Sequence, residues 1–239
     1  MGLNKKILDK RFWLDLIMPN RCCFCNKIIS WYSFCCNECA KQIPYIDQPI
    51  CKLCGKYTCM CSRGLSYDYC FCVVWYNPIM HSAVVKYKVE SPDNFCMLFG
   101  DNLAKQIKKT NYASNIDIVT CTPMTKKSKR KRGYNQAYEL AKVIARFLEV
   151  PVTDKILVKN RDNVSQHELT FEERLLNTKN LFGASPSVNL RGKTVLLVDD
   201  VITTGSTLNS CTKVLKARGA STVICAAVAT TKLHNEKHS

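Results

Sequence analysis

The distribution of cysteine constrains the fold of this chain more than any other feature of the sequence. Twelve of its sixteen cysteines lie between Cys22 and Cys72, although the chain has 239 residues. This stretch has few long hydrophobic runs, so it needs cross-links or metal ions to fold. A disulfide-rich secreted head and a metal site in a reducing compartment are two arrangements that produce such a cluster.

The spacing of the cysteines favours metal ions. A Cys-x-x-Cys turn supplies two thiolates to one zinc ion, and two such turns complete a tetrahedral site. We therefore predict two structural zinc sites, the first with Cys22, Cys25, Cys36 and Cys39, and the second with Cys51, Cys54, Cys59 and Cys61. The short Cys59-x-Cys61 spacing leaves Cys70 or Cys72 as substitutes in the second site, and a head without metal is the alternative to both sites.

The first twenty residues do not resemble a secretory signal. Asp9 and Asp15 interrupt their apolar positions, and no small-residue cleavage site follows. A run of 18 apolar residues is also missing from the sequence, so we expect no membrane span. We predict a cytoplasmic protein, in which zinc-bound thiolates are favoured over disulfides.

Positive charge is the second unusual property of the chain. It has 35 Lys and Arg against 19 Asp and Glu, a formal net charge of +16. The densest run holds six bases in seven positions: Lys126, Lys127, Lys129, Arg130, Lys131 and Arg132. Such a block repels itself, so we expect a mobile loop that contacts a polyanion. A solvated surface, or a lysine bias of the genome, is the alternative.

Hydrophobic patterning divides the chain into a Cys-rich head at residues 1–72, an α/β domain at 73–231 and a polar tail at 232–239. Helices are predicted at 3–17, 79–90, 93–109, 134–149 and 205–218, and a polar helix or turn at 171–178. Strands are predicted at 73–76, 116–121, 155–158, 194–198 and 221–230. Strands that alternate with helices predict a mostly parallel sheet with helices on both faces.

The most informative segment for function is residues 195–207. A continuous apolar run ends in Asp199 and Asp200, and a hydroxyl-rich loop around Gly205 then leads into a helix. Backbone N–H groups at a helix N-terminus bind phosphate, and carboxylates accept hydrogen bonds from sugar hydroxyls or hold Mg²⁺ through water. The pattern is neither GxxxxGK[ST] nor GxGxxG. It indicates a site for a phosphorylated ribose, and a merely structural strand–turn–helix is the alternative.

This segment resembles the phosphoribosyl-pyrophosphate (PRPP) signature of type I phosphoribosyltransferases. The resemblance implies that the two acids contact the ribose 2′- and 3′-hydroxyls and that the loop surrounds the 5′-phosphate. The implied PRPP-binding residues are Asp199, Asp200, Thr203, Thr204, Gly205, Ser206 and Thr207.

Residues 12–230 as a whole resemble the ComF/ComFC family. The resemblance rests on the Cys-rich head, Lys86-Tyr87-Lys88, Arg132-Gly133-Tyr134-Asn135-Gln136 and the PRPP loop. It implies a double zinc ribbon joined to a type I phosphoribosyltransferase-like domain. It also implies that the protein handles incoming single-stranded DNA in natural transformation, in a pathway with a DNA-uptake helicase, DprA and RecA. One departure is Cys121-Thr122-Pro123, where many members have Pro-x-Pro.

The resemblance also suggests catalytic roles. If a nucleophile displaced pyrophosphate from the ribose, Mg²⁺ and cations would stabilise the leaving group. Asp199, Asp200, Lys86 and Arg132 are the candidate catalytic residues, with Lys88 beside them, although Lys86 is equally consistent with a surface lysine. Tyr87, Tyr134 and Trp75 are either base-stacking or packed residues. His167 is expected at the surface, and Arg174 and Asn177 are expected to brace loops.

Three functions therefore stay open. The first is a competence protein that handles single-stranded DNA and binds PRPP. The second is a phosphoribosyltransferase that acts on an unidentified acceptor and releases pyrophosphate. The third is a sensor of PRPP or a nucleotide, which binds without chemistry, so the sequence leaves enzymatic activity undecided.

Overall fold

The computed structural model describes residues 19–56, 59, 61, 64–88, 93–160 and 181–232. Several predictions lie outside these described residues: the helices at 3–17 and 171–178, the roles of His167, Arg174 and Asn177, and the tail beyond Lys232. Within the described part of the chain, none of the helices has the length and apolar character needed to cross a membrane.

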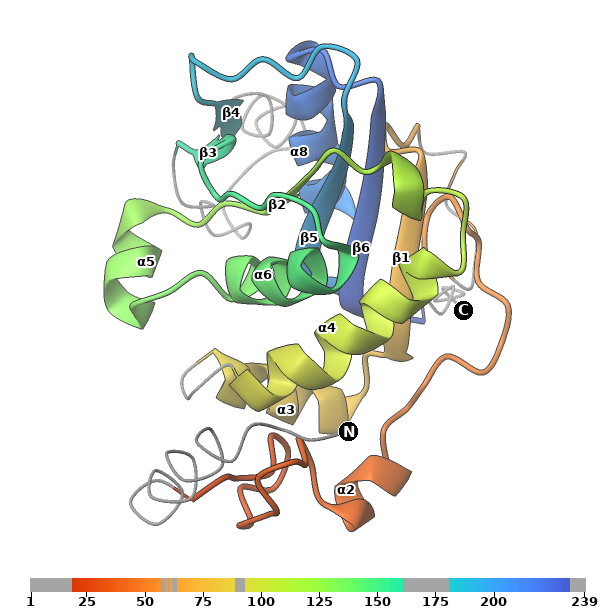
Figure 1. Ribbon diagram of the computed structural model, residues 1–239, viewed down its shortest axis with the longest axis vertical. Coiled ribbons are helices and arrows are strands. Elements are labelled where there is room, and N and C mark those ends of the chain that lie inside the picture. The colour runs from red at the N-terminus through yellow and green to blue at the C-terminus, as the bar shows by residue number, and fades with distance from the viewer. Residues whose placement is uncertain are drawn as a thin grey trace, which may run out of the picture.

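The centre of the structure is a four-stranded parallel sheet (Figure 1). Its strands follow the order β1-β6-β5-β2, with bounds Tyr69–Trp75, Thr222–Thr230, Thr194–Ile202 and Ile118–Cys121. The two longest strands, β5 and β6, are central and largely buried. Their continuous apolar runs arise because both faces of a parallel sheet are covered.

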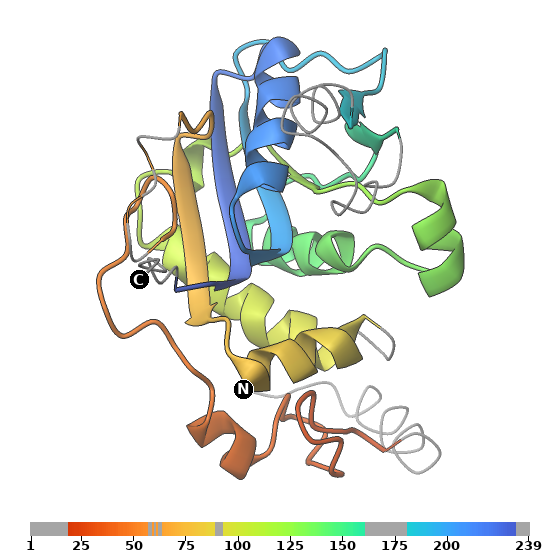
Figure 2. The ribbon, with the colours of Figure 1, turned by 180° about the vertical axis from the view of Figure 1, so that it is seen from behind.

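Helices cover the two faces of this sheet, as the two views show (Figures 1 and 2). On one face lie α4 (Asp93–Lys108) and α6 (Gln136–Leu148), with α3 (Pro78–Tyr87) beside α4; α8 (Ser206–Ala217) lies on the other. The side chains of β5 alternate accordingly. Leu196 and Val198 join the α4 and α6 core, whereas Val195 and Leu197 join the α8 core. The predicted fold class is confirmed.

Most predicted elements begin or end a few residues from their predicted bounds. The strand predicted at 73–76 begins earlier, at Tyr69, and the strand predicted at 155–158 is β3, Leu157–Lys159. A short strand that the sequence analysis missed, β4 (Phe182–Ala184), pairs antiparallel with β3. A 3-10 turn, η2 (Ala113–Asn115), precedes β2.

The prediction of a mobile loop at residues 126–132 is wrong, because these residues form the helix α5 (Lys126–Arg132). Thr125 caps the helix: its Oγ1 accepts a hydrogen bond from the Ser128 backbone N–H at 3.2 Å. Gly133 ends the helix in a left-handed conformation with φ 82°. Cap and stop signals therefore outweigh the repulsion among the six bases.

The Cys-rich segment packs against the sheet domain. Its described residues include the short helix α2 (Asn37–Lys41), below α3 and α4 in Figure 1. Cys22, Phe24 and Ile43 are buried in the same core as Phe99 of α4, and the rings of Phe24 and Phe99 lie edge to face with centroids 6.3 Å apart. Further along, residues 44–46 pair with β1, since the Trp75 backbone N–H donates to the Pro44 carbonyl at 2.8 Å.

Candidate functional site

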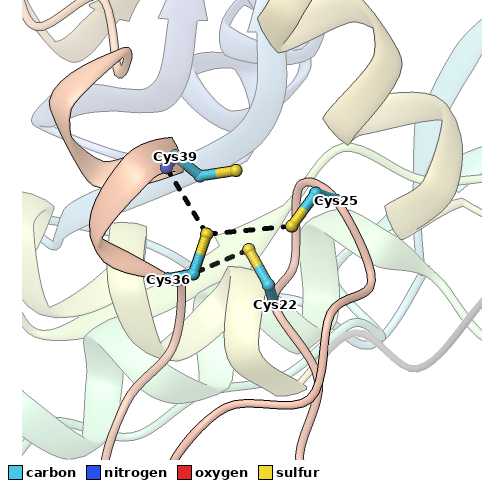
Figure 3. A group of neighbouring side chains, drawn as sticks. All are labelled: Cys22, Cys25, Cys36 and Cys39. Carbon is cyan, nitrogen blue, oxygen red and sulfur yellow. Dashed lines mark hydrogen bonds between the residues drawn. The ribbon is translucent and has the colours of Figure 1, made fainter.

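The first predicted metal cluster is assembled as the spacing indicates (Figure 3). The four Sγ atoms of Cys22, Cys25, Cys36 and Cys39 all lie within 4.8 Å of one another. The Sγ atoms of Cys25 and Cys36 are 3.7 Å apart. Backbone N–H groups point at the sulfurs as well: the Cys36 N–H donates to Cys22 Sγ at 3.4 Å, and the Cys39 N–H to Cys36 Sγ at 3.5 Å.

The second cluster has the same form and contains Cys51, Cys54, Cys59 and Cys61, with all four sulfurs within 4.8 Å of one another. Cys51 Sγ lies 3.5 Å from Cys61 Sγ and 3.7 Å from Cys59 Sγ. The substitutes Cys70 and Cys72 are not in this cluster, because they are buried in β1 on the α8 face of the sheet.

The sulfur–sulfur distances fit zinc and exclude disulfides. With Zn–S bonds of about 2.3 Å, the edges of a tetrahedron are about 3.8 Å, whereas a disulfide bond is about 2.05 Å. None of the sixteen cysteines forms a disulfide bond. Burial opposes ionisation of the Cys22 thiol, but N–H donors from Cys25, Cys36 and Phe24 outweigh it and lower its pKa to about 7.

In the second cluster, burial likewise opposes ionisation of the Cys51 thiol, but backbone N–H donors outweigh it and lower its pKa to about 7. Burial and the neighbouring thiols instead raise the pKa of Cys39 in the first cluster and of Cys61 in the second. The geometry of both clusters suits structural zinc, whose positive charge would favour the thiolates that it requires.

The two acids at the end of β5 lie in different environments. Asp199 Oδ1 accepts hydrogen bonds from Thr122 Oγ1 and from the Asp200 backbone N–H, both at 2.9 Å. Burial, reinforced by the charge of Asp200, raises the pKa of Asp199 to about 7. Asp200 Oδ2 forms an ion pair with Lys88 Nζ at 3.0 Å. The pair thus presents one carboxyl that titrates near neutral pH and one that is held by a cation.

The loop that follows β5 forms an open hollow. Asp199 and residues 201–208 line it, and α8 begins at its edge. Gly205 stands at the N-cap with φ +79°, a left-handed conformation that favours glycine, and it has no side chain to cap the helix. Thr204 Oγ1 donates to Ser206 Oγ at 3.0 Å. Hydroxyls and helix N–H groups therefore face the hollow, which is the donor set that a phosphate requires.

Lys88, rather than Lys86, reaches the acids. Lys86 Nζ instead donates to the backbone carbonyl of Phe24, within the first cysteine cluster. Tyr87 between them is buried: its hydroxyl donates to the Gln136 carbonyl, and its own carbonyl accepts a hydrogen bond from Tyr134 Oη at 2.5 Å. The Lys-Tyr-Lys motif therefore connects the first cluster, the core and the acids.

The Arg-Gly-Tyr-Asn-Gln motif braces the site. Asn135 caps α6 by accepting from the Ala137 N–H at 3.1 Å, and its Nδ2 donates to the Thr122 carbonyl at 3.0 Å. Arg132 Nη1 donates to Gln136 Oε1 at 3.4 Å, rather than to either acid. The motif thus joins α5, α6 and the end of β2.

The basic run is exposed along α5, which projects from the sheet in Figure 1. Lys129 Nζ forms an ion pair with Asp154 at 3.0 Å. Of the aromatic candidates for base stacking, Tyr134 follows α5 and is half-buried, with its hydroxyl donating to the Tyr87 carbonyl. Trp75 is only 6% exposed and Tyr87 only 2%. Both residues are therefore packed in the core.

Sequence reasoning missed Lys56, the largest fully buried polar side chain of the site region. Its Nζ donates to the Ile202 carbonyl at 2.7 Å and to Thr231 Oγ1 at 3.1 Å. No sequence pattern indicates that this side chain is buried, because a lone lysine after a Cys-x-x-Cys-Gly turn is ordinarily exposed.

Two protein families match this chain. The phosphoribosyl transferase domain family matches residues 100–239, and the double zinc ribbon domain family matches residues 13–73. The first covers more than half of the chain, and the second covers both cysteine clusters.

Among characterised proteins, "Competence protein F" of Haemophilus influenzae is 28% identical over 220 residues, which are 90% of this chain and 93% of that protein. "DNA utilization protein YhgH" of Escherichia coli K12 is 31% identical over 107 residues, about half of each protein. Solved structures that match include a phosphoribosylpyrophosphate synthetase from Mycobacterium smegmatis (22% identity, TM-score 0.37, 55% of this chain and 33% of that one). Another is a hypoxanthine phosphoribosyltransferase from Staphylococcus aureus (13% identity, TM-score 0.39, 59% of this chain and 74% of that one).

Proposed function

This chain belongs to the ComF family, in which a double zinc ribbon precedes a phosphoribosyltransferase domain. From that premise we propose that it binds PRPP at the end of β5 and single-stranded DNA along α5. In this proposal the protein handles incoming DNA during natural transformation, in the cytoplasm, in the same pathway as a DNA-uptake helicase, DprA and RecA. The transferase fold then serves as a ligand-responsive part of a DNA-handling protein.

One observation carries the PRPP half of the proposal: the Asp199 carboxyl, a hydroxyl-rich loop and a helix N-terminus line one hollow, and Asp200 adjoins Asp199 at the end of β5. A bare phosphate would be repelled by Asp199 and Asp200, whereas a ribose 5-phosphate satisfies all three features. Its phosphate accepts hydrogen bonds from residues 203–207, and its hydroxyls donate to the acids.

Magnesium fits the same residues, since the carboxylate oxygens of Asp199 and Asp200 are the hard donors that this ion prefers. When bound with PRPP, Mg²⁺ would offset the negative charge of the pyrophosphate group. Lys88 would add a second positive charge beside it, once Asp200 turns from Lys88 to the ribose.

Titration calorimetry with PRPP and Mg²⁺ tests this half of the proposal. We expect saturable binding to the wild-type protein and about a hundredfold weaker binding to Asp200→Asn, because a neutral amide oxygen accepts from the ribose hydroxyls more weakly than a carboxylate does, and the amide NH₂ cannot accept at all. Asp101→Asn, at a half-buried carboxylate of α4 that pairs with Lys105, is the matched control, and it should bind as the wild type does. Wild-type protein that does not bind PRPP would contradict the proposal.

Exposed positive charge supports the DNA half. Single strands bind to cationic surfaces, and their affinity falls steeply with salt. Six exposed or half-exposed bases on one short helix offer such a surface, and only Lys129 among them pairs with a carboxylate in the part of the chain described. Binding of a labelled single-stranded 40-mer, measured across salt with and without PRPP and Mg²⁺, is the test. No binding at low salt would refute it.

A second candidate, a true phosphoribosyltransferase, is favoured by the position of Lys88 at the acid pair. In this reaction an acceptor nitrogen attacks C1 of the ribose with its lone pair. The C1–O bond breaks, its electron pair leaves with pyrophosphate, and the acceptor's proton passes to solvent. Pyrophosphate release across a panel of bases and amines tests this function, with Lys88→Met expected to lower it. If no acceptor in the panel gives turnover, the transferase function is rejected and only the binding function remains.

A further inference from the structure

The second cysteine cluster lies directly against residues 203–207, the proposed phosphate loop. Lys56 follows the Cys54-Gly55 turn of this cluster, and its side chain extends to the end of β5. There, Nζ donates to the Ile202 carbonyl at 2.7 Å, immediately before Thr203, the first residue of the loop. Lys56 is 2% exposed, and its hydrogen bond to the Ile202 carbonyl is buried.

A second connection runs through Thr231. Its Oγ1 lies 3.1 Å from Lys56 Nζ and donates to the carbonyl of Thr203 at 3.2 Å. The Thr231 backbone N–H also donates to the Ile202 carbonyl at 3.2 Å. Lys56 and Thr231 thus fix both carbonyls at the point where β5 becomes the loop.

The segment after the cluster holds the other end of the loop. Tyr67 Oη donates to the Cys54 carbonyl at 3.4 Å and would lie 3.3 Å from a Cβ placed on Gly205. The Ser66 backbone N–H donates to Asn209 Oδ1, on the first turns of α8, at 2.7 Å. The loop is therefore held at its start by Lys56 and at its end by Ser66 and Tyr67.

Gly55 shows how closely the cluster approaches the sheet. A Cβ on this residue would lie 2.8 Å from Cys70 Sγ and 3.2 Å from Cys72 Sγ, and φ is +68°. Only glycine permits this approach and this backbone conformation together. The position of Lys56 is consequently fixed by the Cys51–Cys54 turn, which zinc would hold.

We propose that Lys56 is a positioning residue through which the second zinc cluster holds the phosphate loop in its binding conformation, so that zinc binding there and ligand binding at residues 203–207 stabilise each other. This inference rests on the proposed PRPP site. A coupling of this kind is reciprocal: whatever zinc contributes to ligand affinity, the ligand contributes to zinc affinity.

The buried ammonium itself argues for a specific role. Burying a charge is expensive, and an apolar side chain of the same length often serves stability equally well. Lys56→Met should therefore fold and keep the melting temperature of the wild type, while it removes the donors to Ile202 and Thr231. Lys52→Met, at an exposed position of the same turn, is the matched control.

Hydrogen exchange of the ligand-free protein is the first test. In Lys56→Met, the backbone N–H groups of residues 203–207 should exchange about tenfold faster or more, as expected for lost hydrogen bonds from a charged donor. Exchange in β6 should not change, and Lys52→Met should match the wild type. Unchanged loop exchange in a folded Lys56→Met protein would overturn the inference. If that variant does not fold, Thr231→Val, which removes only the hydroxyl, gives the same comparison.

Alkylation of the cysteines, resolved by mass spectrometry, is the second test. PRPP with Mg²⁺ should slow alkylation of the second cluster in the wild type, and Lys56→Met should weaken this protection about tenfold. Equal protection in both proteins would overturn the coupling. A wild-type protein that fails to bind PRPP refutes the proposed function instead, and the exchange of the ligand-free loop still decides whether Lys56 positions it.

Discussion

Asp199 makes ligand binding depend on pH near neutrality. Its pKa is raised to about 7, chiefly by burial and further by the charge of Asp200, against an ordinary value of 3.8. Ribose hydroxyls donate best to the carboxylate, which forms only as pH rises through 7. PRPP affinity, measured by calorimetry, should therefore rise about tenfold between pH 6 and pH 8. For folding the sign is opposite, because the folded state binds the proton more tightly and loses stability as pH rises from about 4 to 7.

Asp199→Asn is the control for this prediction. The phosphate groups of PRPP also titrate, so the comparison of variant and wild type isolates the contribution of the protein. The variant should bind more weakly and lose the rise that belongs to Asp199. A rise of the same size in both proteins would assign the effect to the ligand.

Gly205 is the backbone position on which the phosphate loop depends. Its φ of +79° costs an L-residue roughly 1–2 kcal/mol, and a Cβ there would also lie 3.3 Å from Tyr67 Oη. Gly205→Ala should consequently weaken PRPP binding about tenfold in calorimetry. Gly192→Ala has the same backbone strain, with φ +73° and open space around it. This control should lower the melting temperature similarly and leave PRPP affinity unchanged. Equal PRPP affinity in all three proteins would contradict the prediction.

The sequence indicated the acids and the loop at the end of β5 better than it indicated the residues that hold them. Asp199, Asp200 and the loop follow one another in the chain, so their convergence needs only a strand, a turn and a helix. Lys88 and Lys56 come from segments more than a hundred residues away. Their contacts depend on how α3 and the second cluster pack, which no local pattern encodes.

At the scale of elements, α5 is a helix that its own positive charges destabilise. Lys126 and Arg130, like Lys127 and Lys131, are like charges four residues apart, a spacing that costs about 0.2–0.5 kcal/mol for each pair. Lysines in the first turn also oppose the helix dipole. A polyanion bound along α5 would remove both costs, so we expect single-stranded DNA to stabilise this helix.

Salt dependence of DNA binding tests the role of α5. Each phosphate contact to a single strand contributes about 0.7 to the slope of log affinity against log salt. The double variant Lys126→Gln and Lys127→Gln should lower this slope by about 1.4. Lys108→Gln with Lys109→Gln removes the same charge from exposed positions at the end of α4 and should leave the slope unchanged. Equal slopes for both variants would assign DNA binding to net charge rather than to α5.

Elements with strong periodicity were predicted well, and those decided by a single contact were not. The buried runs of β5 and β6 and the apolar stripe of α6 are long enough to decide their own structure. The three-residue strand β4 exists because it pairs with β3, and α5 depends on the Thr125 cap. A charge-based reading of residues 126–132 overlooked that cap.

At the scale of the whole molecule, the Cys-rich head and the sheet domain share one core. The sequence suggests a head that unfolds alone, because its composition differs so sharply from that of the α/β domain. Composition cannot show that the ring of Phe24 lies edge to face on that of Phe99, or that Lys86 donates a hydrogen bond to the Phe24 carbonyl. These contacts make the first zinc cluster a support for α3 and α4.

A shared core predicts that damage within the head destabilises the sheet domain. Phe24 is 8% exposed, and truncation of a buried phenylalanine costs about 3–5 kcal/mol. In a chain of this size that corresponds to a fall in melting temperature of about 10 °C. Circular dichroism follows the helices and strands of residues 69–230, so Phe24→Ala should show this fall, together with a single transition.

Ile28→Ala is the matched control, because Ile28 lies in the same head but is 66% exposed. This variant should have the melting temperature of the wild type. An independent head would give a different result: Phe24→Ala would retain the melting temperature of the sheet domain and lose only its zinc. Under the shared core, removal of zinc by a chelator should instead destabilise the sheet domain as Phe24→Ala does, since Phe24 packs on α4 from between Cys22 and Cys25 of the first cluster.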